Sequence, residues 1–320
     1  MKRLLRCLLL LPLLGMPLLT ACDDDDKLPK AEPGTDIASE DNVNRNPTAA
    51  STDYARLEFP RLKGGDNNVV LVRRVPNYGI NYAIEYDIEK RSQRWTCWQW
   101  YSGNSGSSWN RKYWDEQTDN YWAMLNLRDY GWGDPFQPDP DLPVGARTEL
   151  EEYKGSGYQR GHICASGDRL NSMEANEQTF YLSNIMPQTS QLNNGIWQDM
   201  ESHLRNKWNN NDFRRVLYVV KGGTVDLGNT NGFTSTGLLI PKYFFMALLC
   251  EDDKGQYKAL GFKVEHSNRN ESGQPLRNYV VSISELETLT GIDFFCNLPD
   301  ATERSVETAT KAQIIKDWEL

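Results

Sequence analysis

Short apolar runs, rich in β-branched and aromatic residues, lie on both sides of a more polar central part of the chain. Runs of this length, bounded by turn residues, are typical of β-strands. They occupy residues 69–72, 82–86, 95–100, 215–220, 240–249, 257–264 and 279–283. Because strands and helices do not alternate regularly, the pattern predicts an α+β domain. We expect a mixed, mostly antiparallel central sheet flanked by helices.

Loop and helix signals separate these runs. Residues 102–109 are rich in Gly and Ser, and residues 134–143 contain four prolines and three aspartates. Both compositions predict irregular connections. The segment Ser284–Glu287 predicts a capping box that opens a short helix, and Gly291 is expected to end that helix.

The central segment predicts a helix that begins near Asn193. Trp197, Glu201 and Arg205 follow at intervals of four residues, and on a helix this spacing places side chains along one face. An amide, a carboxylate and a guanidinium would share that face, with His162 approaching from outside. Such a set can bind a hard metal ion, contact a phosphate and activate a water molecule.

Each of these residues also has a simpler interpretation. Asn193 or Asn194 is a favoured N-cap for the following helix. Glu201 and Arg205 could form an i,i+4 ion pair worth roughly 0.2–0.5 kcal/mol. Trp197 fits core packing better than chemistry.

His162 is one of only three histidines. Arg160 lies two residues before it, on the same side of an extended segment, and Gly161 permits close approach of backbone or ligand. An imidazole in this position can accept a proton from water near neutral pH. His203 should point away from the Glu201 face, and His266 follows a strand, so both are expected at the surface.

The first 55 residues predict a targeting segment and a tether. Basic Lys2, Arg3 and Arg6 precede an apolar run that is too short and too interrupted by proline and glycine to span a membrane. The run ends in Leu19-Thr20-Ala21-Cys22, which resembles a bacterial lipobox. Residues 1–21 are therefore expected to be a lipoprotein signal peptide, and Cys22 to carry the lipid. An ordinary secretory signal with a chance cysteine is the alternative.

Residues 22–55 are polar and rich in Pro, Asn and Asp, which predicts a disordered, lipid-anchored linker. The folded domain would then cover residues 56–320 in the bacterial cell envelope, facing the periplasm or the outside. The acidic run Asp23–Asp26 resembles a surface-export signal, or is simply a solvated charge run. Loss of the three basic residues would change the net charge from −9 to −9 − 3 = −12. An acidic chain does not exclude nucleic-acid substrates, but it argues against binding by broad counterion release.

Four cysteines remain outside the signal and lipid site: Cys97, Cys164, Cys250 and Cys296. In an envelope protein they predict two disulfides with three possible pairings, of which we favour Cys97–Cys164 and Cys250–Cys296. A zinc site would be the alternative, but no Cys or His pair has ligand spacing.

Three stretches together resemble the DNA/RNA non-specific endonuclease family of ββα-metal (His-Me finger) nucleases. They are Arg160-Gly161-His162, Ser183–Gln188, and Asn193-x-Gly195-x-Trp197-x-x-x-Glu201-x-x-x-Arg205. Weaker similarity extends from about Asn67 to about Leu298. The resemblance implies a finger in which a strand bearing His162 faces the helix of Asn193.

The resemblance also implies an activity and a role for six residues. The activity would be Mg²⁺-dependent hydrolysis of DNA and RNA to 5′-phosphate products, with Mn²⁺ as a possible substitute. The implied roles are His162 as general base, Asn193 as direct metal ligand, Glu201 as support for the metal's waters, Arg160 and Arg205 as phosphate contacts, and Asn184 as a residue that helps hold the site.

Two positions depart from the family pattern. Gln159 replaces a usual aspartate, so any tuning of His162 by a nearby carboxylate is in question, and Ala165 replaces a common proline. The usual aspartate is not the base, so we expect activity to survive, and we expect Ala165 to be tolerated. Two rivals stand beside the enzyme: an inactive surface lipoprotein that binds nucleic acid or a partner on the same fold, and a purely structural envelope lipoprotein. The sequence does not specify the oligomeric state.

Overall fold

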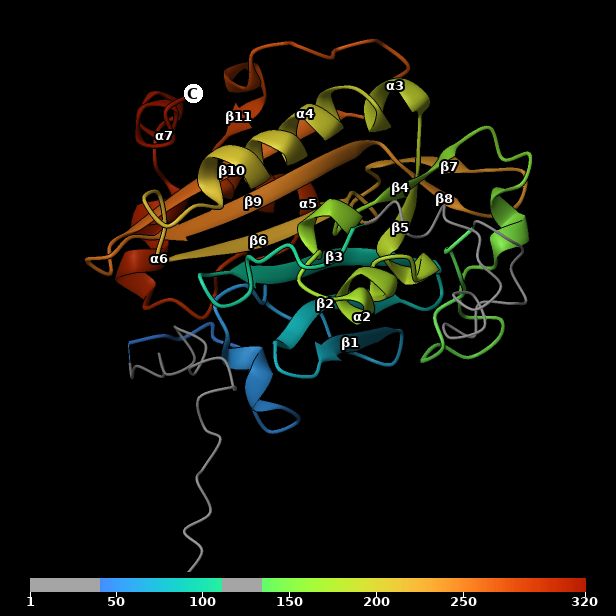
Figure 1. Ribbon diagram of the computed structural model, residues 1–320, viewed down its shortest axis with the longest axis horizontal. Coiled ribbons are helices and arrows are strands. Elements are labelled where there is room, and N and C mark those ends of the chain that lie inside the picture. Colours follow the sequence, from blue (N-terminus) through green and yellow to red (C-terminus); the bar gives the residue numbers. More distant parts are fainter. Residues whose placement is uncertain (1–40, 111–133) are drawn as a thin grey trace, which may run out of the picture.

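The computed structural model describes residues 41–110 and 134–320 (Figure 1). The expected signal peptide, the lipidation site Cys22 and the first part of the linker lie outside these residues. Within the two described ranges, no helix combines the length and apolar character needed to cross a bilayer.

A seven-stranded sheet forms the centre of the molecule. Its order is β1-β2-β3-β6-β9-β10-β11, and every neighbouring pair is antiparallel. The strands are β1 (Asn68–Val75), β2 (Gly79–Asp87), β3 (Ser92–Trp100), β6 (Val216–Gly223), β9 (Tyr243–Glu251), β10 (Tyr257–Glu265) and β11 (Val280–Val281). The expected α+β class with a mostly antiparallel sheet is confirmed.

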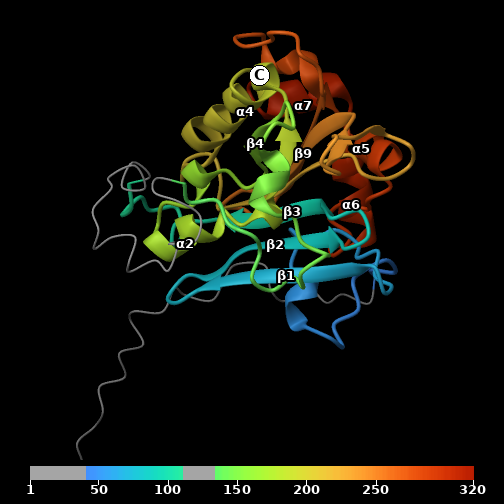
Figure 2. The same cartoon turned by 90° about the vertical axis from the view of Figure 1, so that its right-hand side faces the viewer.

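Helices cover both faces of this sheet (Figure 2). Alternate side chains of β3, β6, β9 and β10 enter two apolar clusters, because successive residues of a strand point to opposite faces. One cluster includes side chains of α4 (Ile196–His203) and α7 (Lys311–Asp317). The other includes side chains of α5 (Ile283–Thr290) and α6 (Asp300–Glu307).

A smaller two-stranded sheet lies beside the main one and leads into the α4 layer. It pairs β4 (Gln159–His162) with β5 (Ile185–Gln188), and α3 (Ser190–Asn193) and α4 follow directly. Two strands followed by helix is the order expected for a ββα finger. The remaining elements are η2 (Thr52–Ala55), η5 (Leu150–Tyr153), η6 (Ser166–Asp168), α2 (Met173–Gln178), η7 (Leu182–Asn184), η8 (Leu204–Trp208), the β7 (Thr230–Phe233) and β8 (Leu239–Pro241) pair, and η9 (Leu276–Tyr279).

The predicted strand 240–249 is two strands. β8 pairs with β7, whereas β9 pairs with β6 and β10, so the chain changes partners at Lys242. The predicted strand 279–283 is also wrong in part, since only Val280–Val281 pairs with β10.

The helix after β11 begins earlier than predicted. Ser282, not Ser284, is the N-cap: its hydroxyl accepts from the backbone N–H of Glu285, whose carboxylate accepts from the N–H of Ser282. This is a capping box shifted by two residues. The helix ends at Gly291, whose φ of 66° is easily adopted only without a side chain, as predicted.

The folded part of the chain starts before residue 56. Asn42 donates to the carbonyls of Cys296 (2.8 Å) and Leu298, and Asn46 donates to the carbonyl of Pro60 (2.9 Å). Asn42 and Asn46 are 7% and 2% exposed. Part of the predicted linker is therefore packed on the domain, because its asparagines satisfy backbone groups that composition alone does not reveal.

The expected disulfides are absent from the described residues, which contain all four cysteines as buried free thiols. Cys164 and Cys250 lie in the cluster beneath α4. Cys97 lies in the opposite cluster, where Cys296 contacts the carbonyl of Phe59. The pairings Cys97–Cys164 and Cys250–Cys296 are wrong because each would join opposite faces of the sheet.

Candidate active site

β4 carries Arg160 and His162 on one side, as expected for residues two apart in a strand. A loop residue, Phe136, contacts both: its ring centroid lies 4.1 Å from the Arg160 guanidinium carbon and 5.2 Å from the imidazole centroid. Phe180 packs edge-on against the imidazole at 5.0 Å. Asp134 accepts a hydrogen bond from Arg160 at 2.6 Å. Aromatic packing and one ion pair thus set the direction of both side chains.

Gly161 lies between them on the other side of the strand, where no side chain fits. A Cβ there would lie 2.2 Å from Cδ of Gln188, which is fully buried on the paired strand β5. The glycine therefore leaves room for the buried side chain of Gln188 against β4.

The helix that follows is broken, contrary to the prediction of one helix from Asn193 to Arg205. Asn193 is the last residue of α3, whose N-cap is Thr189, and Gly195 is the N-cap of α4. The predicted N-cap role of Asn193 or Asn194 is wrong. A Cβ at Gly195 would lie 2.2 Å from the carbonyl oxygen of Gln191, so the break depends on this glycine.

β4 runs along the α3–α4 segment and contacts it at both ends. At one end, Gln159 Oε1 accepts from Asn193 Nδ2 at 2.8 Å. At the other, the carbonyl of His162 accepts from the indole of Trp197 at 3.4 Å. Gln159 thus orients the amide of Asn193 and leaves its oxygen available to accept; the amide of Gln159 contacts α3 rather than His162.

Gln159, Arg160 and Asn193 line a cavity of about 640 Å³. Its other walls come from the 134–136 loop, η5 and the chain leading to β4, and include Lys154, Tyr153 and Tyr158. The cavity is open to solvent and large enough for a small polar ligand.

Glu201 does not pair with Arg205. Its Oε1 accepts from Nζ of Lys221, on the central strand β6, at 2.5 Å. Lys221 is fully buried and Glu201 is 9% exposed. Burial raises the pKa of Glu201, and the ammonium of Lys221 opposes that shift.

Arg205 is held instead by Asp168, with Nη1 to Oδ1 at 2.5 Å. The α-helix ends at His203, and Arg205 lies in the π-helical turn η8. Wider π turns rotate the following residues relative to α-helical spacing. The expected single helix face from Asn193 to Arg205 is therefore interrupted. Glu201 and Arg205 take separate partners.

Asn184 is fully buried and acts on the backbone. Its amide donates to the carbonyls of Cys164 (2.9 Å) and Thr179 (2.8 Å), and its oxygen accepts from the N–H of Cys164 (2.9 Å). It thereby ties the start of β5 to the chain that follows His162.

The model of the DNA/RNA non-specific endonuclease family matches residues 71–301, which include every residue of this site. The chain belongs to that family. It is an enzyme of the non-specific endonuclease class, a phosphodiester hydrolase, and the family is one of metal-dependent nucleases.

Similar proteins agree with this assignment. A nuclease of Nostoc sp. is 31% identical over 71% of this chain and 75% of its own length. The mitochondrial nuclease EXOG of Xenopus laevis is 28% identical over 68% of this chain, which spans 58% of the frog protein. A chain in the crystal structure of the EndoG/EndoGI complex has the same fold, with a TM-score of 0.57 and 20% identity over 75% of this chain and 90% of that one.

Two oxygen atoms of the endonuclease site are of the type that hard divalent cations prefer. The amide oxygen of Asn193 is presented by the Gln159 contact, and Oε2 of Glu201 makes no hydrogen bond recorded among the described residues. Magnesium prefers oxygen ligands and retains several waters, so few protein ligands suffice.

Several residues that shape the endonuclease site were not predicted: Asp134, Phe136, Asp168, Lys221 and His266. Lys221 alone carried a signal, since a lysine directly after five strand residues suggests a buried charge with a partner. The other four depend on contacts between distant segments.

His266 was expected at the surface, but it is 7% exposed. Its Nε2 accepts from the N–H of Thr189 at 2.9 Å, so Nδ1 must donate to the carbonyl of Pro241 at 2.8 Å. It thus supports the N-cap of α3. His203 packs on Trp208, on α4 but outside the site.

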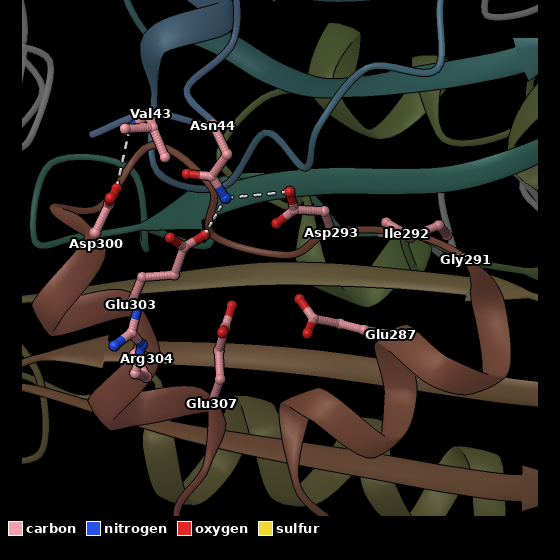
Figure 3. Close-up of a pocket in the computed structure, with 10 residues that line it drawn as sticks. All are labelled: Val43, Asn44, Glu287, Gly291, Ile292, Asp293, Asp300, Glu303, Arg304 and Glu307. Atoms are coloured by element: carbon pink, nitrogen blue, oxygen red, sulfur yellow. Dashed lines mark hydrogen bonds between the residues drawn. The ribbon is translucent and has the colours of Figure 1, made fainter.

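A second cavity, of about 490 Å³, lies against α5 and α6 (Figure 3). The carboxylates of Glu287, Asp293 and Glu307 have oxygens within 4.8 Å of one another, and Asn44 donates to Asp293 (3.2 Å) and Glu303 (2.9 Å). Burial raises the pKa of Glu287 and Glu303 to about 7 and that of Glu307 to about 9. The pKa values of these three carboxyl groups are thus raised toward neutral pH, and a cation that binds here would have to displace their protons.

Proposed function

We propose that the protein is a Mg²⁺-dependent, sugar-non-specific endonuclease that hydrolyses DNA and RNA to 5′-phosphate products. The observation that supports it most is the junction of β4 with α3–α4. There Gln159 contacts Asn193 and Trp197 contacts His162, inside the region that matches the endonuclease family.

In this proposal His162 is the general base. It accepts a proton from water, the hydroxide attacks phosphorus, and the bond from phosphorus to the 3′ oxygen breaks. The 3′ oxygen takes up a proton and the phosphate stays on the 5′ oxygen. Packing against Phe136 and Phe180 fixes the imidazole, so little motion is needed for proton transfer.

Arg160 and Arg205 would bind the phosphate and stabilise its developing negative charge. Asp134 and Asp168 hold them through one ion pair each, which leaves other N–H donors of each guanidinium for the substrate. Contacts to phosphate carry no sequence information, so weak sequence preference is expected.

Asn193 would hold Mg²⁺ directly and Glu201 through a water molecule, with Mn²⁺ as a possible substitute. A bound ion supplies Lewis-acid stabilisation of the charge on the phosphoryl and leaving oxygens. Asn184 would keep β4 and β5 in register behind the site.

Cleavage of plasmid DNA and of RNA, with a Mg²⁺ and Mn²⁺ series and with EDTA, tests the proposal. We expect the wild type to cleave both, EDTA to stop cleavage, and His162→Ala to lower the rate at least 100-fold. His203→Ala, a histidine on α4 outside the site, is the matched control. A wild type that binds nucleic acid but cleaves neither substrate would favour the inactive binding protein.

We also propose that the protein is a lipoprotein of the bacterial cell envelope, anchored at Cys22. The basic start, apolar run and Leu19–Cys22 sequence support this. Metabolic labelling with a fatty acid and detergent partitioning of wild type and Cys22→Ser provide the test. Equal partitioning of the two into the aqueous phase would refute the anchor, and protease accessibility on intact cells separates periplasm from surface.

A further inference from the structure

Lys221 is a buried cation, and within residues 41–110 and 134–320 its one acidic partner is Glu201. Its ammonium lies 4.8 Å from the ring centroid of Trp197, 5.6 Å from that of Trp98, and 2.5 Å from Oε1 of Glu201. Removing an ammonium from water costs several kcal/mol unless an opposite charge compensates. Because β6 is central in the sheet and its side chains are enclosed, the ammonium has a fixed position, and so does the oxygen it binds.

Two carboxylates and two cations lie close together around Glu201. The carboxylates are those of Glu201 and Asp168, and the cations are Lys221 and Arg205. Glu201 and Arg205 are four residues apart and close enough for the charge of Arg205 to lower the pKa of Glu201, although burial and Lys221 act more strongly. A glutamate four residues before an arginine ordinarily pairs with it on a helix. Here Lys221 binds Glu201, and the ion pair that the described part of the chain gives Arg205 is with Asp168.

We propose that Lys221 is a positioning residue that holds the Glu201 carboxylate away from Arg205, so that the guanidinium remains available to a substrate phosphate. The inference rests on the proposed function, because it takes Arg205 as a phosphate contact. Without the ammonium, Arg205 is the next cation that Glu201 can reach. Two carboxylates on one guanidinium would occupy its donors and cancel its charge.

Binding of a short DNA oligonucleotide in EDTA, followed by fluorescence anisotropy, tests this without turnover. Lys221→Met should weaken binding about tenfold, the loss expected for one charge-assisted contact of about 1.4 kcal/mol. Arg205→Met should weaken it equally. Lys221→Arg, which keeps a cation against Glu201, should bind within about threefold of the wild type.

The decisive variant is the double substitution Lys221→Met with Glu201→Gln. If Glu201 captures Arg205 in Lys221→Met, then neutralising Glu201 should release the arginine and restore wild-type affinity. Damage to packing would instead persist in the double variant, and persistent weak binding overturns the proposal. So does an Arg205→Met variant that binds like the wild type.

Two further variants make the result interpretable. Lys258→Met is the control. Lys258 lies on β10, far along the sheet from Lys221, and is a partly buried lysine that contacts Phe213 and Trp318. Its substitution should leave binding unchanged. If Lys221→Met does not fold, as judged by urea unfolding in EDTA, Lys221→Gln replaces it with the same expected loss and rescue. Absence of cleavage by a wild type that shows this loss and rescue would refute the nuclease proposal alone.

Discussion

The acidic cluster on α5 and α6 gives a stability that depends on pH, and Glu303→Gln should reveal it. Glu303 is 6% exposed and accepts from the amide of Asn44 at 2.9 Å. Glutamine has nearly the same shape and still offers a carbonyl oxygen to Asn44. The substitution therefore removes a charge while it keeps the hydrogen bond that holds the N-terminal segment.

The magnitude follows from the pKa. Burial raises the pKa of Glu303 from 4.5 to about 7, and the neighbouring acids Asp293, Glu287 and Asp300 contribute. A shift of about 2.5 units corresponds to at most ~3.4 kcal/mol, at 1.36 kcal/mol per unit. Because the folded state holds the proton more tightly, this carboxyl is best tolerated below pH 4.5. Its penalty grows as the pH rises from 4.5 to about 7 and is constant above.

Urea unfolding of wild type and Glu303→Gln at pH 5, 6, 7 and 8 measures this. The difference in free energy of unfolding should be under about 1 kcal/mol at pH 5 and favour the variant by about 1–3 kcal/mol at pH 8. Glu174→Gln, at an exposed position of α2 outside the cluster, controls for the change of residue type. A difference that is the same at every pH would refute the reasoning, and so would a variant less stable than the wild type at pH 8.

Two further predictions concern β4 and α3. Gly161→Ala should cost about 1–3 kcal/mol of stability and slow cleavage, because the new Cβ meets Gln188. Gly106→Ala, in open space, is the control. Equal melting temperatures of Gly161→Ala and the wild type would contradict the contact. His266→Ala should cost about 1–3 kcal/mol at pH 7.5, because the N–H of Thr189 loses its acceptor. Burial lowers the pKa of His266, so its contribution should be present above about pH 6.5 and fade on acidification; a loss that grows below pH 6 would contradict this.

Local patterns were enough for the strands of the main sheet. Runs such as 82–86 and 95–100 fall inside β2 and β3, because apolar and aromatic alternation reflects burial on the faces of a sheet. The same reasoning failed where a partner changes, at Lys242 between β8 and β9. It also missed α6 and α7, whose apolar positions are few.

Spacing along the chain was a weaker guide to the site. The spacing of four residues predicted that the side chains from Asn193 to Arg205 share one helix face. Instead, Gly195 breaks the helix and the π turn displaces Arg205. The disulfides failed for a related reason: cysteine count says nothing about which face of the sheet each thiol occupies.

The amino-acid sequence by itself determined the α+β class, the strand-rich halves and the identity of the residues at the proposed site, since these follow from periodicity and from a motif within about fifty residues. Tertiary structure alone decided their partners: Phe136 against His162, Lys221 on Glu201 and Asp168 on Arg205. An ion pair or ring contact depends on distances across the fold, where burial makes one partner far more favourable than another. Distances between residues that are far apart in the sequence leave no periodic pattern along the chain, so the sequence did not reveal these partners.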